Sequence, residues 1–347
     1  MTLKADIRKR LGNFHLDVHL EAGSERLALL GASGCGKSVT LRCIAGILRP
    51  DEGHIELDGR VLYDSAAGID LPPQRRKIGY LFQQYALFPN MTVRQNIAAA
   101  VGDKSLRAAR AADLLSRFRL EDAAERRPCQ LSGGQQQRAA LARILASGPM
   151  AVLLDEPFSA LDSYLKYQLE LELSDLLEDF SGPVVWVSHD RGEVWRNCRW
   201  VCVLDSGRSA PAVTTEELFR SPGTQSAARL SGCKNYVPIR PAGDRVEIPL
   251  WGVTLSCGRP VPPDTAVIGI RSHRVRPAPE GAVNAIPCAV SRVIDDVFGV
   301  IVLLRPQAAL PGAPLVRMEL PREDWAPLAD AGSLWASVLP EDILLLK

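Results

Sequence analysis

The segment 31–38 contains the first residues whose types and spacing could do chemistry. It has the sequence Gly-Ala-Ser-Gly-Cys-Gly-Lys-Ser and lies between an expected strand at Arg26–Gly31 and an expected helix at Ser38–Gly46. The glycines let the backbone turn its N–H groups toward an anion, and the positive end of the helix faces the same anion. Lys37 would neutralise the β- and γ-phosphates of a nucleotide, and the Ser38 hydroxyl would hold Mg²⁺. The pattern therefore predicts a phosphate-binding loop.

Two acidic residues follow an apolar run later in the chain. Residues 151–157 read Ala-Val-Leu-Leu-Asp-Glu-Pro, so a buried strand is expected to end in Asp155 and Glu156. Asp155 is placed to reach Mg²⁺ through water, and Glu156 projects past the strand end, where it can polarise an attacking water. Two solvated acids after a strand are the alternative, and the phosphate-binding loop earlier in the chain favours the catalytic interpretation.

A third segment, at 131–138, reads Leu-Ser-Gly-Gly-Gln-Gln-Gln-Arg and opens a helix expected to continue through Ala139–Ala146. Exposed N–H groups at a helix start, beside a serine, make a second anion site. A plain helix cap is the alternative interpretation. This segment belongs to a different part of the chain from the phosphate-binding loop, so the two need not serve the same nucleotide.

With these three segments in this order, residues 1–230 resemble the ABC transporter ATPases, and segment 131–138 looks like the signature of that family. The resemblance adds three features. Gln83 matches the glutamine that links the γ-phosphate site to the membrane partner. Residues 159–162, Ser-Ala-Leu-Asp, match the loop that crosses a dimer interface. His189 matches the switch histidine that contacts the γ-phosphate.

The resemblance implies a set of site residues around ATP and Mg²⁺. The catalytic residues expected are Lys37, Gln83, Glu156 and His189. The Mg²⁺ contacts expected are Ser38, Gln83 and Asp155. The nucleotide contacts expected are Phe14, Gly31, Ala32, Ser33, Gly34, Cys35, Gly36, Lys37, Ser38 and Val39. The contacts expected from a second copy of the chain are Ser132, Gly133, Gly134, Gln135 and Asp162.

The sequence departs from the family pattern at two points in this set. Val39 stands where a second hydroxyl residue is usual, although Ser38 is intact, so activity should survive. Leu11-Gly12 stands where an aromatic residue before glycine is common, and that aromatic residue normally stacks on adenine. Phe14 is the candidate for this stacking, and a role in the core is the alternative for Phe14.

Expected strands and helices alternate through the first two-thirds of the chain, which implies a largely parallel sheet. A hairpin at Ile55–Tyr63 and a mainly helical region from about Gln84 to Gly148 interrupt the alternation. After residue 230, frequent prolines and short strand patterns indicate a small all-β domain. The fold expected is therefore an α/β P-loop NTPase of ABC type, with a parallel-sheet core, an antiparallel β part and a helical subdomain, over 1–230. A β-barrel-like regulatory or dimerisation domain is expected over 231–347.

Composition restricts the partners. The chain has 41 basic and 40 acidic residues and no basic block, which gives no electrostatic support for nucleic-acid binding. Its apolar runs are shorter than the roughly 20 residues needed to cross a bilayer, and its eight cysteines are scattered, as expected for free thiols in a reducing compartment. The resemblance then implies a homodimer at the cytoplasmic face of the inner membrane, a permease docked near Gln84–Val93, and indirectly a substrate-binding protein.

Several stretches resemble the ATPase subunit of molybdate importers. They are Leu11–Asn13, Gly59–Asp64, Arg75–Tyr80 and, near the C-terminus, Asn284–Val290. Sulfate, iron and sugar importers share this architecture, so molybdate or tungstate is the preferred substrate, and another small solute is the alternative. A non-transport ABC ATPase is a remote alternative, because such chains usually carry two cassettes or basic insertions. A pure oxyanion sensor would not explain the intact catalytic set.

The C-terminal domain breaks the family pattern where an oxyanion would bind. The family has a Ser-x-Arg/Lys-Asn stretch there, and the matching residues 281–284 are Gly-Ala-Val-Asn. Gly281 and Val283 thus replace the hydroxyl and the cation, and only Asn284 remains. A divalent oxyanion needs several donors to replace its water. We therefore expect this domain to pair with its twin in the dimer and to bind molybdate weakly or not at all, unless nearby arginines supply charge.

Overall fold

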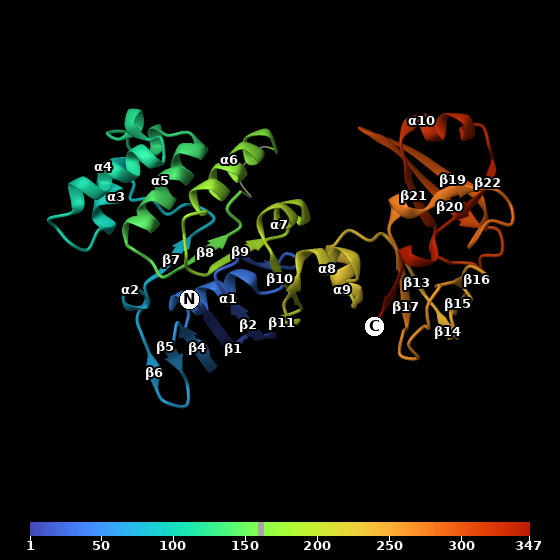
Figure 1. Ribbon diagram of the computed structural model, residues 1–347, viewed down its shortest axis with the longest axis horizontal. Coiled ribbons are helices and arrows are strands. Elements are labelled where there is room, and N and C mark those ends of the chain that lie inside the picture. The colour runs from blue at the N-terminus through green and yellow to red at the C-terminus, as the bar shows by residue number, and fades with distance from the viewer. Residues whose placement is uncertain (159–162) are drawn as a thin grey trace. The chain divides into compact units, whose positions relative to one another are not determined.

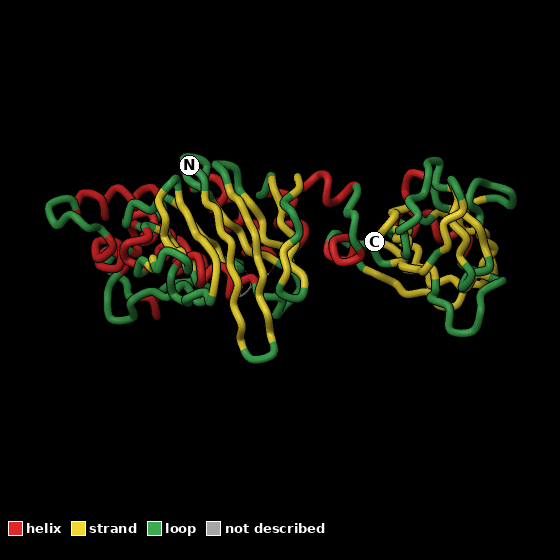
Figure 2. Tube along the Cα trace, turned by 90° about the horizontal axis from the view of Figure 1, so that it is seen from below, coloured by secondary structure: helices red, strands yellow, loops and turns green. Residues whose placement is uncertain are grey.

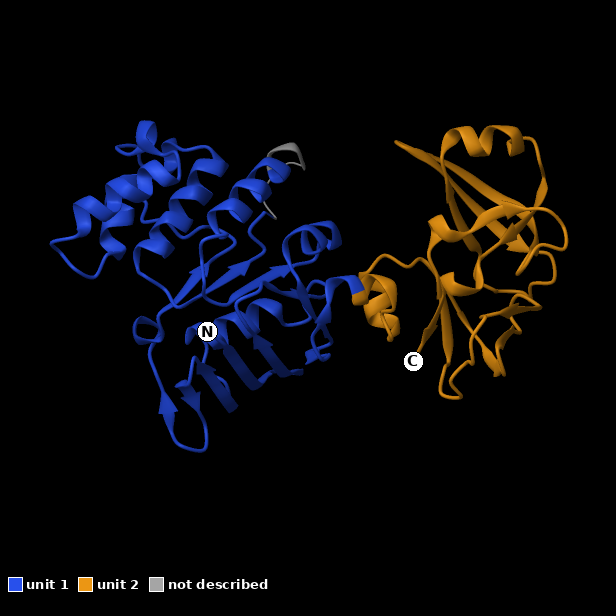
Figure 3. Cartoon of the chain, in the orientation of Figure 1, with its two compact units in different colours: residues 1–216 blue, residues 217–347 orange. Residues whose placement is uncertain are grey.

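The computed structural model describes residues 1–158 and 163–347 and divides the chain into two compact units. Unit 1 comprises Met1–Glu216 and unit 2 comprises Glu217–Lys347 (Figure 3). Two short helices, α8 (Thr215–Arg220) and α9 (Gln225–Leu230), lie at this division. The division falls before α9, whereas the sequence places the domain boundary after residue 230.

Parallel strands form the centre of unit 1 (Figure 1). In spatial order they are β10 (Trp200–Asp205), β3 (Leu27–Leu30), β9 (Val184–Ser188), β8 (Ala151–Asp155) and β7 (Ile78–Leu81). Every neighbouring pair is parallel. The strands are apolar and largely buried, as expected when both faces of a parallel sheet are covered. Because parallel strands share their carboxyl edge, the residues that follow them lie along one edge of the sheet.

An antiparallel part continues this sheet, and Figure 2 shows its strands running side by side. It contains β1 (Leu3–Leu11), β2 (Phe14–Ala22), β4 (Glu52–Leu57), β5 (Arg60–Asp64) and β6 (Ile69–Asp70), with the short β11 (Arg208–Ser209) and β12 (Val213–Thr214) pairing with β10. The hairpin expected at Ile55–Tyr63 is confirmed as β4 and β5. Its turn uses Asp58 and Gly59 at φ of 52° and 79°.

The helices of unit 1 fall into two groups. In the first group, α1 (Lys37–Ala45), α6 (Ser163–Leu176) and α7 (Arg191–Asn197) follow the parallel strands β3, β8 and β9, and the short α2 (Pro73–Arg76) precedes β7. The second group is the helical region: α3 (Val93–Ala100), α4 (Arg107–Arg117) and α5 (Gly133–Ala146), with the short 3₁₀ turns Glu121–Ala123 and Pro128–Gln130. Figure 1 shows α3, α4 and α5 gathered together and apart from α1.

Unit 2 is built almost entirely from antiparallel strands, which confirms the expected all-β domain. One sheet contains β13 (Asn235–Pro238), β17 (Val267–Ile270) and β23 (Ile343–Leu346). A second contains β14 (Arg240–Ala242), β15 (Arg245–Ile248) and β16 (Val253–Ser256). The largest contains β18 (Arg276–Ala278), β22 (Ser333–Ser337), β19 (Ile286–Asp296), β20 (Gly299–Pro306) and β21 (Val316–Leu320), and the short helix α10 (Arg322–Trp325) follows β21. The buried Trp251 belongs to their common core.

Burial also describes the cysteines, all eight of which are free. Seven are buried, and Cys129 is exposed in the 3₁₀ turn Pro128–Gln130. Burial raises the pKa of the Cys43, Cys202 and Cys288 thiols to about 12. Within residues 1–158 and 163–347, the structure has no helix that is both long enough and apolar enough to cross a membrane.

Candidate functional site

The loop between β3 and α1 has the backbone that its glycines require. Gly34 and Gly36 adopt φ of 79° and 111°, in the region that side chains other than glycine rarely enter. A Cβ atom on Gly36 would lie 2.6 Å from Leu16 Cδ1, and one on Gly31 would lie 2.4 Å from the Leu204 carbonyl oxygen. The loop is therefore closely packed against β2 and β10.

Lys37 lies inside this loop, with only 5% of its surface exposed. Its Nζ donates hydrogen bonds to the carbonyl oxygens of Gly31 and Ala32 at 2.8 and 2.9 Å. The same Nζ lies 3.8 Å from Oε1 of Glu156. A cation held this way is available to a phosphate group cradled by the loop.

Ser38 and Asp155 meet at the end of β8, although they lie far apart in the sequence. The Ser38 hydroxyl donates to Oδ1 of Asp155 at 2.7 Å, and the Tyr80 hydroxyl donates to Oδ2 at 2.7 Å. A hydroxyl and a carboxylate side by side are hard oxygen donors, which suit Mg²⁺ when phosphates supply further ligands. The described residues contain no cluster of three His, Cys, Asp or Glu side chains that could hold a metal ion. Ser38 and Asp155 would therefore supply two ligands of a magnesium ion, and not a complete coordination shell.

Sequence reasoning missed Tyr80. Burial, together with the hydrogen bond to Asp155, raises the pKa of the Tyr80 hydroxyl, so Tyr80 remains a donor. Tyr80 lies on β7, which pairs with β8 and places Tyr80 opposite Leu153. The polar hydroxyl of a tyrosine within an otherwise apolar strand, Ile78–Leu81, was the available signal.

Glu156 lies between Lys37 and His189. Its backbone adopts φ of 47°, an uncommon conformation for a residue with a side chain and one that is enriched at functional sites. Its Oε2 is 3.3 Å from Nδ1 of His189, which follows β9. The structure therefore brings together Lys37, Ser38, Asp155, Glu156 and His189 at the carboxyl edge of three neighbouring strands.

The loop that carries His189 is supported by a partly buried polar network that sequence reasoning also missed. Asp190 accepts hydrogen bonds from the N–H groups of Gly192 and Glu193 at the start of α7, and Lys166 Nζ lies 2.5 Å from its carboxylate. Burial raises the pKa of Asp190, but the hydrogen bond and charge of Lys166 outweigh burial, so the pKa lies below its usual value. Trp186 Nε1 donates to the buried Glu193 at 2.5 Å.

Gln83 follows β7 and thus lies on the same sheet edge, with an exposed side chain. The segment after it, Gln84–Val93, leads to α3. Phe88 and Met91 in this segment expose 48% and 37% of their surface. Large apolar side chains are therefore presented to solvent immediately after a residue of the candidate site.

The signature segment lies elsewhere in unit 1, at the start of α5. The Ser132 hydroxyl accepts from the Gln135 N–H at 3.3 Å, and Oε1 of Gln135 accepts from the Ser132 N–H at 3.1 Å. This is a capping box, so the helix-cap interpretation is confirmed as the local role of Ser132. Gly133 and Gly134 form the first turn of α5. Asp162, the remaining residue expected from the partner, lies outside the described residues together with Ser159.

Phe14 borders an open hollow of about 500 Å³ beside the phosphate-binding loop. The hollow is lined by Asn13, by Phe14 and His15 at the start of β2, by Ala32–Cys35 from the loop, and by Asp205, Ser206 and Arg208. Phe14 is half-buried and also packs against the core of unit 1, so both predicted roles are compatible with its position. Val39 packs against the same core.

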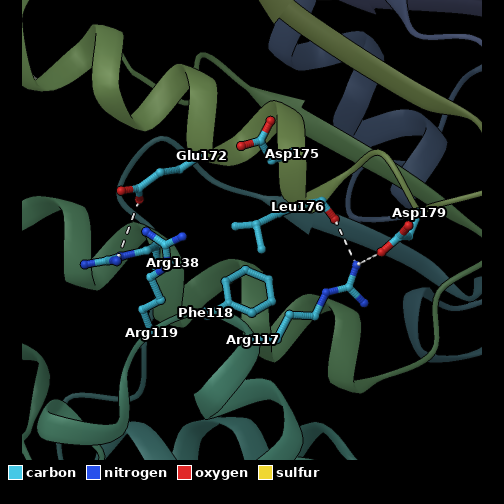
Figure 4. Close-up of a pocket in the computed structure, with 8 residues that line it drawn as sticks. All are labelled: Arg117, Phe118, Arg119, Arg138, Glu172, Asp175, Leu176 and Asp179. Atoms are coloured by element: carbon cyan, nitrogen blue, oxygen red, sulfur yellow. Dashed lines mark hydrogen bonds and ion pairs between the residues drawn. The ribbon is translucent and has the colours of Figure 1, made fainter.

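A second cavity, of about 220 Å³, lies where the end of α4, α5 and α6 meet (Figure 4). Charged side chains of opposite sign face each other across it. Arg117 Nη2 donates to Oδ2 of Asp179 at 2.8 Å, and Arg138 Nη1 lies 3.7 Å from Oε2 of Glu172. None of the residues predicted to contact the nucleotide lines this cavity, although Arg138 is the last residue of the signature segment.

The model of the ABC transporter family matches residues 14–159. A sulfate/thiosulfate import ATP-binding protein from Chromobacterium violaceum is 40% identical over 279 residues, which are 79% of this chain and 74% of that protein. The chain belongs to the ABC transporter family. Unit 1 is the ATPase domain of that family, and the alignment is longer than unit 1, so the similarity extends into unit 2.

Other members of the ABC transporter family are similarly related to the chain. A molybdenum import ATP-binding protein from Paramagnetospirillum magneticum is 42% identical over 64% of this chain and 61% of that protein. Spermidine and putrescine import proteins match at similar identity. A solved dimeric ATP-binding cassette in a post-hydrolysis state, bound to ADP and phosphate, is 30% identical with a TM-score of 0.52, over 62% of this chain and 99% of that one.

Proposed function

We propose that this ATPase subunit hydrolyses ATP to energise an importer of a small oxyanion, with molybdate or tungstate as the preferred substrate. The observation that carries the ATPase part is the cluster of Lys37, Ser38, Asp155, Glu156 and His189. Relatives named for molybdenum and for sulfate/thiosulfate import support the oxyanion. Sulfate, iron or another small solute remains the alternative.

The residues of unit 1 divide the work on ATP by their positions. The loop N–H groups and Lys37 bind the β- and γ-phosphates, and Phe14 borders the hollow where the adenine would stack. Ser38 and Asp155 would hold Mg²⁺, with Gln83, which follows β7, as a further contact. When bound, Mg²⁺ neutralises charge on the phosphates.

Glu156 is the residue that acts on water in this proposal. Its carboxylate lies next to Lys37 and His189, so the γ-phosphate held by Lys37 and His189 would leave Glu156 facing the attacking water. A carboxylate that orients and polarises water contributes about 10²–10⁴-fold to the rate. His189 holds the γ-phosphate and fixes the position of Glu156.

A second copy of the chain completes the site. Ser132, Gly133, Gly134 and Gln135 begin a helix in the helical region, where the helix start can bind the γ-phosphate of a nucleotide on another subunit. The similarity to a dimeric cassette bound to ADP and phosphate supports a homodimer. Asp162 is proposed as a further contact across the dimer. Without closure, water is poorly positioned and hydrolysis is slow.

The membrane partner is proposed to dock on Gln84–Val93, because this segment joins Gln83 to the exposed Phe88 and Met91. The chain would then work at the cytoplasmic face of the inner membrane, with permease subunits and, through them, a substrate-binding protein. Charge balance gives no support for a nucleic-acid partner.

Uptake of labelled oxyanion tests the proposed function. Cells that lack the gene for this chain should lose uptake of labelled molybdate, and the wild-type gene should restore it. The Glu156→Gln gene should not restore uptake. If sulfate uptake is lost and molybdate uptake is kept, the ATPase assignment stands and the substrate is the sulfate alternative. If neither uptake changes, the proposed import of an oxyanion is wrong.

A further inference from the structure

The segment after Gln83 has an unusual backbone. Tyr85 and Ala86 are consecutive residues with side chains, and both adopt left-handed φ, at 57° and 48°. Tyr85 is buried, with 8% of its surface exposed, and among the described residues its hydroxyl has no hydrogen-bond partner. Two left-handed residues and a buried unpaired hydroxyl persist only where surrounding contacts enforce them.

Two side chains from the helical region enforce this conformation. Arg143 of α5 donates to the Ala86 carbonyl oxygen at 2.8 Å and to the Tyr85 carbonyl oxygen at 3.5 Å. Its guanidinium also lies 5.0 Å from the centre of the Phe88 ring, a cation–π distance. Arg143 therefore contacts three of the residues that lie between Gln83 and α3.

Asn96 of α3 holds the other half of the segment. It is fully buried, accepts from the Phe88 N–H at 2.8 Å, and donates to the carbonyl oxygens of Phe88, Met91 and Thr92 at 3.1–3.2 Å. Asn96 thus fixes the turn that leads into α3. Arg143 differs from Asn96 because it reaches across to the segment from α5, the helix that begins with the signature turn.

The guanidinium group of Arg143 makes its polar contacts with the segment that follows Gln83. Arg143 is half-buried, and burial lowers the pKa of its guanidinium. In the described part of the chain, no carboxylate forms an ion pair with it, so its contacts are the two carbonyl groups and the Phe88 ring. A planar guanidinium can bond two carbonyls and stack on a ring at once, and a lysine ammonium cannot.

We propose that Arg143 is a positioning residue that couples the signature turn to the segment Gln83–Met91, so that engagement of Ser132 by the partner's nucleotide moves Phe88 and Gln83 together. Ser132 and Arg143 lie on the same helix, separated by about 16 Å at 1.5 Å per residue. A helix of this length moves as a rigid body, so a displacement at its start reaches the Ala86 carbonyl through one hydrogen bond. The proposal rests on the proposed function of the signature segment and of Gln83.

A fluorine probe on the full-length chain tests the coupling. The change Phe88→4-fluorophenylalanine places the probe next to Arg143, and Glu156→Gln allows ATP to stay bound while the spectrum is recorded. We expect ATP with Mg²⁺ to shift the ¹⁹F resonance. Arg143→Ala should abolish that shift. Arg107→Ala is the matched control, since Arg107 donates to the Val101 carbonyl at 3.0 Å in the same helical region and should leave the shift intact.

Steady-state hydrolysis, measured with Glu156 and Phe88 restored, provides the second readout. Arg143→Ala should lower kcat roughly tenfold or more, as expected when Gln83 is misplaced, and should leave KM for ATP within about twofold. A merely structural role would lower the melting temperature without removing the ATP-dependent shift from the folded molecules. A wild-type ¹⁹F shift together with a kcat within about twofold would overturn the proposal.

If Arg143→Ala does not fold, Arg143→Lys replaces it in both measurements. Lysine keeps the charge and one donor, so an intermediate ¹⁹F shift is expected, and a full wild-type shift would contradict the role of the guanidinium geometry. A different result would contradict the proposed function. If Glu156→Gln hydrolyses ATP at the wild-type rate, the catalytic assignment is wrong whatever Arg143 does.

Discussion

Asp155, the last residue of β8 in unit 1, and Asn284, in the turn before β19 in unit 2, both belong to sequence patterns that suggest a ligand. The Asp155 carboxylate accepts from two side chains, Ser38 and Tyr80. The Asn284 amide bonds only to the backbone. Its Oδ1 accepts from the Ser256 N–H at 2.7 Å, and its Nδ2 donates to the carbonyl oxygens of Ser256 and Val338 at 2.9 and 3.1 Å.

The two sites differ in whether a hydrogen bond can be exchanged for a contact with a ligand. Ser38 can rotate its hydroxyl toward an arriving ion and leave Asp155 paired with Tyr80. Asn284 has two N–H donors and one acceptor oxygen, and all are in use. Asn284 also adopts φ of 54°, so it shapes the turn before β19. Its bonds join this turn to Ser256 and Val338, which makes its role in unit 2 structural.

Arg271, His273, Arg274 and Arg292 are the cationic side chains of unit 2 that could replace the missing donors, and two of them, Arg271 and Arg274, bond to other groups of unit 2. Arg271 donates to the Ser231 carbonyl oxygen at 2.7 Å and to that of Phe219. Arg274 lies 3.4 Å from the Asp342 carboxylate. Burial, with the neighbouring arginines, lowers the pKa of His273 and thus disfavours its cationic form. Arg271 and Arg274 are therefore bonded within unit 2, as Asn284 is.

The largest effect expected from this contrast is in unit 1. Glu156→Gln should lower kcat by about 10²–10⁴-fold, because the variant keeps the shape of the site and loses the base. ATP binding should persist, and sedimentation with ATP should show dimers. Lys37→Ala is the contrasting variant, since it should weaken ATP binding itself. Near-normal turnover of Glu156→Gln, or monomers at saturating ATP, would contradict the prediction.

In unit 2, Asn284→Ala should lower stability without lowering turnover. Each of the backbone groups left without a partner costs about 1–3 kcal/mol, so the calorimetric transition of unit 2 should move to lower temperature. Asn284→Gly is the matched variant, because glycine tolerates the left-handed φ and removes only the hydrogen bonds. A loss of ATPase rate in the folded Asn284→Gly protein would show that Asn284 has a role beyond the turn.

Tyr80→Phe should have a smaller effect, on the magnesium dependence of unit 1. The variant removes one hydrogen bond to the Asp155 carboxylate, so the Mg²⁺ concentration at half-maximal rate should rise by roughly tenfold at most. KM for ATP, measured at saturating Mg²⁺, should be unchanged. If the Mg²⁺ dependence matches the wild type, Tyr80 only packs against β8.

The smallest effect expected is the heat of molybdate binding to unit 2. Calorimetric titration of the full-length chain with molybdate should give no saturable heat at micromolar concentrations, because Asn284, Arg271 and Arg274 are already engaged. Saturable micromolar binding that survives in Lys37→Ala would place an oxyanion site in unit 2 and remove the contrast between the units.

The sequence predicts the contact between Ser38 and Asp155 because each residue belongs to a motif whose parts meet at a sheet edge. It also predicts the hairpin of β4 and β5, because Asp58-Gly59 is a local turn signal. Sequence reasoning missed strands β1 and β2, although the alternation in β1 is a local strand signal: Leu3, Ala5 and Ile7 are buried at every second position.

Other features lie beyond local patterns. Arg143 and Tyr80 are defined by partners 57 and 75 residues away, and no spacing rule connects them to Ala86 and Asp155. The short strand patterns expected after residue 230 do not show where one strand ends and the next begins; β15 and β16, for example, are separated by a turn that ends at Gly252 with φ of 66°. From the sequence alone, the Asn284 amide is a possible donor to an anion. The structure shows that its three partners are backbone groups.

The uneven burial of the thiols has a practical consequence for spectroscopy. Of the eight cysteines, all of which are described, Cys129 is the exposed one, three residues before Ser132. A maleimide reagent should therefore attach a nitroxide at this native position with no engineered cysteine. Pulsed electron resonance between two such nitroxides would then give the distance between the signature turns of two copies, before and after ATP is added.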